Sequence, residues 1–378
     1  FEIAVIIFFV ILAGGVAFNT PSPIQFLVSI KEYLFLWSFY LVIAFGLIRE
    51  RTLDRIWRWL PWLVPLTLPV VIYQHFVVVQ ERANLGATWD AVVGLFGGDP
   101  EGGGASGAMG FFTVFAIVLV ISLWRAGCFG RWRAALIVLS GLACIALAEV
   151  KFAIILIPIG IALLYSRELL RRPLQSLAVL AVAVGVAFSI LAAYQMQFVS
   201  GQTREGRSLG AYIDVQIERA TATDNIDMRS ARMGRLTALK FWSQRHGLED
   251  PVRLLFGHGI GSTRIGTMAV GEVARKYSLW VGTSALAVLL WETGLLGALA
   301  FASFLLFGAL AARRAARQMA EAVRSWHAAL LRALGVGLLL LLLELPYNPD
   351  MTGTSAIQLL AILALGYIAA VRRGYVVT

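Results

Sequence analysis

The chain has 378 residues, of which 59% are hydrophobic and only 14% are charged, and its mean hydropathy is +0.78. Soluble domains carry about a quarter charged residues, so this composition excludes an ordinary soluble fold and indicates a membrane protein. The net charge of +10 does not indicate nucleic-acid binding, because the basic residues gather at the ends of apolar runs, as membrane topology requires. The two cysteines, Cys128 and Cys144, predict neither a disulfide framework nor a metal site.

Apolar runs of membrane length follow one another along the chain. A span needs roughly 20 apolar residues, and about ten runs are candidates. They cover residues 2–18, 33–48, 60–79, 111–124, 134–149, 152–165, 175–196, 281–311, 328–345 and 355–371. We therefore expect an all-α fold, a polytopic membrane helix bundle. It would comprise an N-terminal bundle (1–196), one large, mainly helical polar loop (197–280) and C-terminal transmembrane helices (281–378).

Arginine-rich connectors alternate with connectors that are nearly free of basic residues. The arginine-rich ones lie at 49–58, 125–133, 167–172, 313–324 and 372–373. The positive-inside bias assigns them to the cytosol. The large loop, the glycine-rich loop 80–110 and the loop 344–354 are then expected to share the opposite, non-cytosolic face.

A set of arginines in the large loop forms the first candidate site. Its members are Arg204, Arg207, Arg229, Arg232, Arg235 and Arg264. Three of them recur every third residue in an amphipathic helix expected from about Met228 to Trp242, so they would lie along one side of it. Arginine presents a planar fork of donors that suits phosphate oxygens, and the start of a helix adds free N–H groups. The cluster could therefore hold a diphosphate, although a solvated, salt-bridged surface explains the same spacing.

Two further features could carry chemistry. In GHGIG (257–261), alternating glycines allow close backbone approach, either to a ligand or in a tight turn, and His258 is a candidate proton shuttle or a structural histidine. Glu149 with Lys151 interrupts two apolar runs, and Glu292 lies inside another. Such acids usually face a cavity or a partner, although Glu149 and Lys151 could simply mark a membrane boundary and Glu292 could make a buried hydrogen bond between helices.

The order of these motifs resembles the O-antigen ligase and Wzy polymerase superfamily. The segment GRLTALKFW (234–242) is followed by LFGHGIGSTR (255–264) and then by ALAVLLWETGLLG (285–297). Members of this superfamily are multi-span proteins with one large periplasmic loop late in the chain, and the resemblance implies a GT-C-like fold in the bacterial inner membrane. The EVK sequence at 149–151 and GGDPEGGG at 97–104 look like the exopolysaccharide-polymerase branch.

The resemblance implies a glycosyltransferase that needs no metal, nucleotide or other cofactor. Its donor and acceptor would be oligosaccharides linked to undecaprenyl diphosphate. The lipid bilayer, chain-length regulators and export proteins are further partners to consider, and nucleic acid is not. Arg235 matches the diphosphate-binding arginine, with Arg204, Arg207, Arg264 and Lys151 as further candidates. Glu292 matches the family's glutamate, and it competes with His258 and Glu149 for the role of base.

One departure from the family pattern separates the alternatives. Ligases carry a His-Asn pair shortly before the glutamate, where this chain has Thr283 and Ser284. This favours a polymerase that joins lipid-linked repeat units over an O-antigen ligase that transfers glycan to lipid A-core, and it leaves the base unassigned. From another class, a polytopic transporter or flippase would also explain many helices, buried acids and a cationic face.

Overall fold

The structure is a computed structural model that describes residues 1–19, 21–83, 90–97, 104–166, 221–227, 231–266, 270–320 and 325–376, with the single positions 168, 174, 181, 184, 185 and 189. Within these residues the fold is mostly helical. Eight of the described helices are long and apolar enough to cross a membrane, and one further apolar helix, Lys151–Leu164, is shorter. The chain is therefore a helical membrane protein, as its composition predicts.

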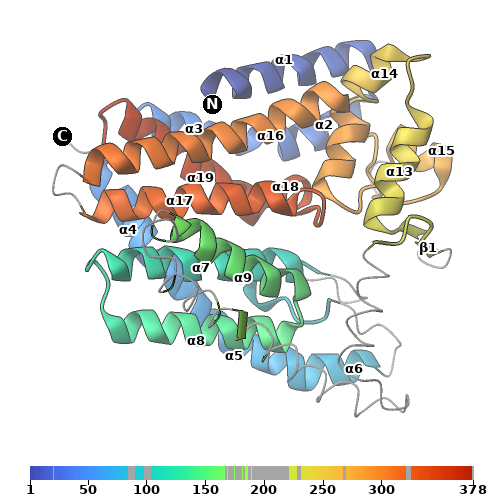
Figure 1. Ribbon diagram of the computed structural model, residues 1–378. Helices are drawn as coiled ribbons and strands as arrows, with labels where there is room; N and C mark the ends of the chain where they lie inside the picture. The colour runs from blue at the N-terminus through green and yellow to red at the C-terminus, as the bar shows by residue number, and fades with distance from the viewer. Residues whose placement is uncertain are drawn as a thin grey trace. The chain divides into compact units, whose positions relative to one another are not determined.

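Figure 1 shows the elements in chain order. Their bounds are α1 Glu2–Asn19, α2 Pro23–Ile30, η1 Lys31–Phe35, α3 Trp37–Ala44, α4 Glu50–Trp59, η2 Leu60–Trp62, α5 Leu63–Tyr73, η3 Gln74–Val78, α6 Val79–Ala83, η4 Gly94–Phe96, α7 Ser106–Arg125, α8 Arg131–Ala148, α9 Lys151–Leu164, β1 Ile226–Asp227, β2 Arg232–Met233, α13 Arg235–Arg245, α14 Pro251–Phe256, α15 Glu272–Tyr277, α16 Ala285–Ala320, α17 Ser325–Glu344, α18 Asp350–Gly353 and α19 Ser355–Arg372.

The apolar runs predict most of the helices, but they predict less well where a helix begins. Every predicted span meets an apolar helix except 175–196, which lies almost wholly outside the described residues. The predicted span 60–79 is the later part of a longer helical stretch, Glu50–Arg82. Its first part, α4, buries Leu53 and Trp57. These residues are four positions apart and share one helix face, so the arginine-rich connector at this point is itself an amphipathic helix.

The expected helix from Met228 to Trp242 is wrong at residues 231–234, which are not helical, while residues 228–230 lie outside the described residues. Helix α13 begins only at Arg235, and the preceding residues form an antiparallel hairpin in which β1 pairs with β2. The reason is local, because Gly234 is a poor helix residue and occupies the extended N-cap position of α13. Arg232 therefore lies in a strand and does not share a helix side with Arg235.

The chain forms two compact units, each built from segments that are far apart in the sequence. Unit 1 comprises Phe1–Leu41, Gly210–Gly308 and Leu341–Leu363, and unit 2 comprises Val42–Leu209, Ala309–Leu340 and Ala364–Thr378. The three-part division made from the sequence stays a prediction.

Each unit has its own core. In unit 1, the ring of Phe8 packs edge-on against Phe301 and Phe304, and Trp37 packs against Phe304. In unit 2, α7 is buried along almost its whole length and packs against α8 and α9 (Figure 1). Small residues let helices approach closely in membranes, and here Gly337 lies directly against the ring of Phe115.

Candidate functional site

The candidate site lies in unit 1 and is built around a break in α16. Gly294 has φ 68° and ψ −169°, which are not helical angles, so the backbone turns out of the helix just after Glu292. A break of this kind frees the carbonyls of the preceding turn, and such groups need new partners at membrane depth. The partners come from the large loop. Trp242 Nε1 donates to Leu290 O at 3.0 Å, and the N–H groups of residues 258 and 259 donate to Trp291 O and Glu292 O at 2.7 and 3.0 Å.

The glycines of GHGIG make this close approach possible. Gly257, Gly259 and Gly261 all have positive φ, between 72° and 83°, a region that other residues rarely adopt. A Cβ at Gly257 would lie 2.6 Å from the backbone carbon of Glu292. The predicted close backbone approach is therefore an approach of this loop to helix α16 of the same chain. Amide side chains hold the loop from the other side, since Asn19 donates to Gly257 O at 3.2 Å and Gln25 to Ile260 O at 3.0 Å.

Glu292 anchors the loop through its side chain. Tyr33 donates its hydroxyl to Oε2 at 2.8 Å, and Thr263 donates its hydroxyl and its backbone N–H to Oε1 at 2.6 and 3.3 Å. The residue is only 3% exposed. Because both oxygens already accept hydrogen bonds and neither faces open space, this geometry suits a carboxylate that positions η1 and the loop against α16. The role of base for Glu292 stays a prediction, and its surroundings do not favour it.

His258 belongs to a buried histidine pair that sequence spacing does not reveal. His246 Nδ1 lies 2.9 Å from Trp242 O, and the Nε2 atoms of His246 and His258 are 3.0 Å apart. Because a carbonyl only accepts, the network assigns the proton of His246 to Nδ1, so its Nε2 accepts from the Nε2–H of His258. The Nδ1 of His258 is then bare and enclosed, with Glu272 Oε1 at 4.0 Å.

Burial lowers the pKa of both histidines. Loss of solvation lowers the pKa of His258 to about 4, and the charges of His246 and Arg253 act in the same direction. Burial also lowers the pKa of His246, partly opposed by its hydrogen bond to Trp242 O. His258 is 4% exposed, so a substrate hydroxyl does not reach its ring. The structural interpretation of His258 is the one that this geometry favours.

Arg235 presents the cation that best fits the diphosphate hypothesis. It is the first residue of α13, and that helix start has no side-chain cap. Its guanidinium stacks 3.8 Å above the ring of Tyr347, and its Nε donates to Tyr347 O. Within the described ranges no carboxylate is paired with Arg235, whereas Arg264 is bound to Glu32. Arg235 is half-buried, so the residue as a whole is not closed off from the surface.

A buried acid pair holds the segment that carries Tyr347. Glu344 and Asp350 are 2% and 5% exposed, and their carboxyl groups are close enough to share a hydrogen bond. Asn348 donates to Glu344 Oε1 at 3.1 Å, and a proton held between the two carboxyl groups would supply the bond that Glu344 Oε2 otherwise lacks. The segment also covers the start of α16, where Asn348 O accepts from Ala285 N at 2.9 Å.

The remaining predicted site residues fall elsewhere. Arg204, Arg207 and Arg229 lie outside the described residues. Glu149 and Lys151 belong to unit 2, where Glu149 ends α8 in a left-handed conformation and Lys151 begins α9.

Thr283 and Ser284 stand where the resemblance expects the His-Asn pair of ligases, and here Thr283 is half-buried and Ser284 is buried. Ser284 accepts a hydrogen bond from Ala287 N at 3.2 Å and so caps the start of α16. Thr283 Oγ1 is enclosed, and no described residue forms a hydrogen bond with it.

The fold also gathers a group of potential metal ligands in unit 2 that the linear spacing of the histidines does not predict. Ligand atoms of Glu50, Asp54 and His327 all lie within 4.8 Å of one another. His327 Nδ1 is 2.7 Å from the Tyr367 hydroxyl, which orients its Nε2 toward Glu50 Oε1 at 3.3 Å. Carboxylates and imidazole suit several divalent cations, but the contact between His327 Nε2 and Glu50 Oε1 also satisfies these two groups without a cation.

Comparison with protein-family models found no matching model, and a search of curated proteins found no relative.

Proposed function

We propose that the protein is a polysaccharide polymerase of the bacterial inner membrane, with a GT-C-like fold and its large loop in the periplasm. It would join oligosaccharide repeat units carried on undecaprenyl diphosphate. The observation that carries the proposal is Arg235, a half-buried arginine held in place by Tyr347 and without an acidic partner among the described residues. The motif order GRLTALKFW, GHGIG and WETG, which resembles that superfamily, supports the same assignment.

The chemistry requires a cation where charge develops. The bond between the anomeric carbon of the donor and the diphosphate oxygen breaks, and its electron pair leaves with the lipid diphosphate. The acceptor hydroxyl oxygen forms the new bond, and its proton passes to solvent water. Fixed cations stabilise the departing charge most strongly where water is scarce, and an arginine fork can bind two phosphate oxygens at once.

Glu292, the GHGIG loop and the acid pair act as positioning elements in this proposal. Glu292 fixes the loop against α16, and the pair of Glu344 and Asp350 fixes the segment that carries Tyr347. Tyr347 in turn holds Arg235. The buried positions of Glu292 and His258 leave them a supporting role, so we assign neither of them to proton removal.

The test uses the purified full chain with a lipid-diphosphate oligosaccharide and mass analysis of the product. Arg235→Ala should lower the rate of chain elongation by about 100-fold or more, the range for removing one donor to a developing charge. Arg235→Lys should retain part of the rate, because it keeps the charge but loses the planar fork. Lys240→Ala is the matched control, since Lys240 is exposed on the same helix and bonds only Thr223 in the described structure.

Two outcomes would redirect the assignment. Near-normal polymer from a folded Arg235→Ala variant would refute the role of Arg235. Consumption of lipid A-core as acceptor would identify an O-antigen ligase.

The broken helix α16 is the observation that favours a second function, a transporter or flippase, because discontinuous helices often hold transported ions or substrates. Against it, groups of the large loop already bond the carbonyls before the break and Oε1 of Glu292, and Tyr33 of η1 bonds Oε2. Movement of labelled substrate across proteoliposomes without bond formation would favour this alternative.

A further inference from the structure

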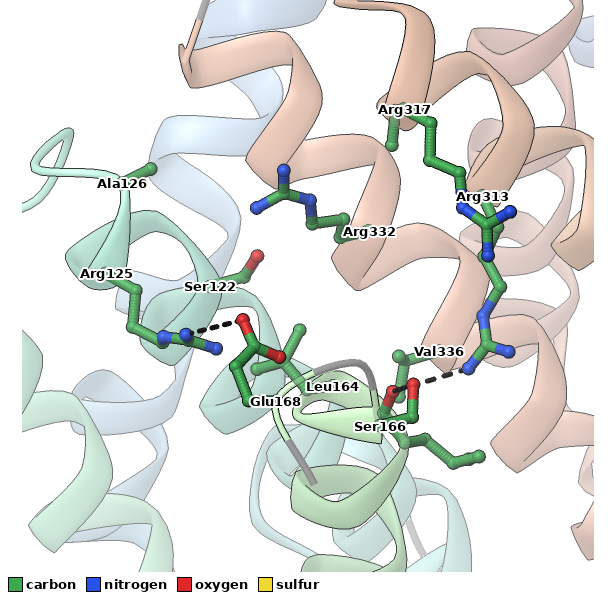
Figure 2. A pocket seen from close by; sticks show the side chains of 12 residues that line it. Ser122, Arg125, Ala126, Leu164, Ser166, Glu168, Arg313, Arg317, Arg332 and Val336 are labelled. Carbon is green, nitrogen blue, oxygen red and sulfur yellow. Dashed lines mark hydrogen bonds and ion pairs between the residues drawn. The ribbon is translucent and has the colours of Figure 1, made fainter. Parts of the chain in front are cut away.

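Unit 2 contains a pocket whose described lining includes four arginines from three helices. Figure 2 shows Arg125 at the end of α7, Arg313 and Arg317 on α16, and Arg332 on α17 around one cavity. The cavity has a volume of about 210 Å³, which is enough space for a phosphate group and part of what it is attached to. None of these residues belongs to the candidate site of unit 1.

The positive charge of the pocket is only partly balanced. Glu168 is the single acid among the described residues of the lining, and it is bound to Arg125 at 2.9 Å. Burial raises the pKa of Glu168, but hydrogen bonds and the charges of Arg125 and Arg332 outweigh burial and lower it overall. Among the described residues, no acid is paired with Arg313, Arg317 or Arg332. Like charges repel, so an arrangement of this kind gains stability from a bound anion.

The arrangement of donors suits phosphate. Arg313 donates one N–H to Leu163 O at 3.3 Å, and Arg125 stacks 4.0 Å from the ring of Tyr165. These contacts fix two of the guanidinium groups that line the cavity, and Figure 2 shows both arginines beside it. Guanidinium groups bind phosphate through paired hydrogen bonds, and several of them can engage different oxygens of one group.

Apolar side chains complete the lining and indicate what accompanies the phosphate. Leu163, Leu164 and Val336 lie in the same cavity as the arginines. The helices around them are of membrane type, and the topology expected from the sequence assigns these basic ends to the cytosol. Basic pockets between membrane helices on that side commonly hold anionic lipid headgroups. The positive-inside bias accounts for arginines at helix ends, but it does not require arginines of three helices to converge on one cavity.

We propose that this pocket binds a phosphate group, supplied by the headgroup of an anionic phospholipid or by a free phosphate. The proposal is independent of the function assigned to unit 1.

The test compares two sources of phosphate with the full-length protein. In one arm the protein is purified from mixed vesicles of phosphatidylglycerol and phosphatidylcholine, and retained lipid is measured by native mass spectrometry. In the other arm binding of inorganic phosphate is measured by calorimetry. The double variant Arg317→Ala with Arg332→Ala should reduce binding about tenfold or more. Arg314→Ala is the matched control, since Arg314 neighbours Arg313 on α16 but does not line the cavity.

A second variant keeps the test decisive if the double variant does not fold. Ser166 lines the pocket and is exposed, so Ser166→Glu should place a competing carboxylate beside the arginines and also weaken binding. Variant-sensitive retention of phosphatidylglycerol supports the lipid source, and variant-sensitive binding of inorganic phosphate alone supports the soluble source. Binding that is absent, or equal in the wild type and in the folded pocket variants, overturns the proposal.

Discussion

Replacing His258 by glutamine should make the folded protein less sensitive to acid. In the wild-type protein the Nε2–H of His258 faces the bare Nε2 of His246 at 3.0 Å. A glutamine amide can donate the same hydrogen bond but cannot take up a proton in this pH range. The substitution therefore keeps the contact and removes the titrating group.

The direction and size of the effect follow from the pKa of His258. Folding lowers this pKa from 6.5 to about 4, so below pH 6.5 the unfolded chain binds a proton that the folded chain does not. The contribution is fully present above pH 6.5 and is lost as the pH falls toward 4. At 1.36 kcal/mol per unit, the full loss is roughly 3 kcal/mol. Part of this loss arises from the interaction between His258 and His246, so the stability of the variant will keep some pH dependence from His246.

The assay is thermal unfolding of the purified protein in detergent between pH 7.5 and pH 4.5. The wild-type midpoint should fall by several degrees more than that of His258→Gln across this range. His75→Gln is a suitable control, because His75 is a buried histidine of unit 2 that contacts a carbonyl, Leu147 O, at 2.8 Å. Parallel pH profiles for the wild type and His258→Gln would refute the inferred tautomers and the buried neutral pair.

Two further predictions concern the segment of the large loop that packs against α16. Gly261→Ala should lower the free energy of unfolding by more than about 1 kcal/mol, because Gly261 has φ +72° and an added methyl group would collide with the side chain of Ser29. The control is Gly353→Ala, which should leave the melting temperature nearly unchanged, because no atom lies within 4 Å of the added group. Equal melting temperatures for the two variants would contradict the packing described. Thr263→Val removes the 2.6 Å hydroxyl bond to Glu292 and should cost about 1–3 kcal/mol in denaturant titrations; a variant as stable as the wild type would show that Glu292 does not depend on this donor.

The sequence predicts most of the membrane-spanning helices, because each of them has to be a continuous run of apolar residues. It predicts the hairpin before α13 poorly, since Arg229, Arg232 and Arg235 recur with helical spacing on both sides of Gly234. Because Gly234 takes the N-cap position, the helix begins only at Arg235.

The candidate site could be predicted only in part. Glu292, His258 and Arg235 stand out by residue type and position, but their partners Tyr33, His246 and Tyr347 are ordinary residues in distant segments. The sequence therefore marks the polar groups, and the tertiary contacts decide which of them is open to a ligand. Those contacts close Glu292 and His258 and leave Arg235 half-buried.

The break at Gly294 has a consequence for the order of assembly. The loop residues 257–261 precede α16 in the sequence, so they leave the ribosome before the helix that needs them. Until they dock, the carbonyls of Trp291 and Glu292 lack their partners from the loop, and the segment around Gly294 gains most by staying an unbroken helix. Insertion of α16 and closure of the loop should therefore be coupled, with the kink forming only when the loop arrives.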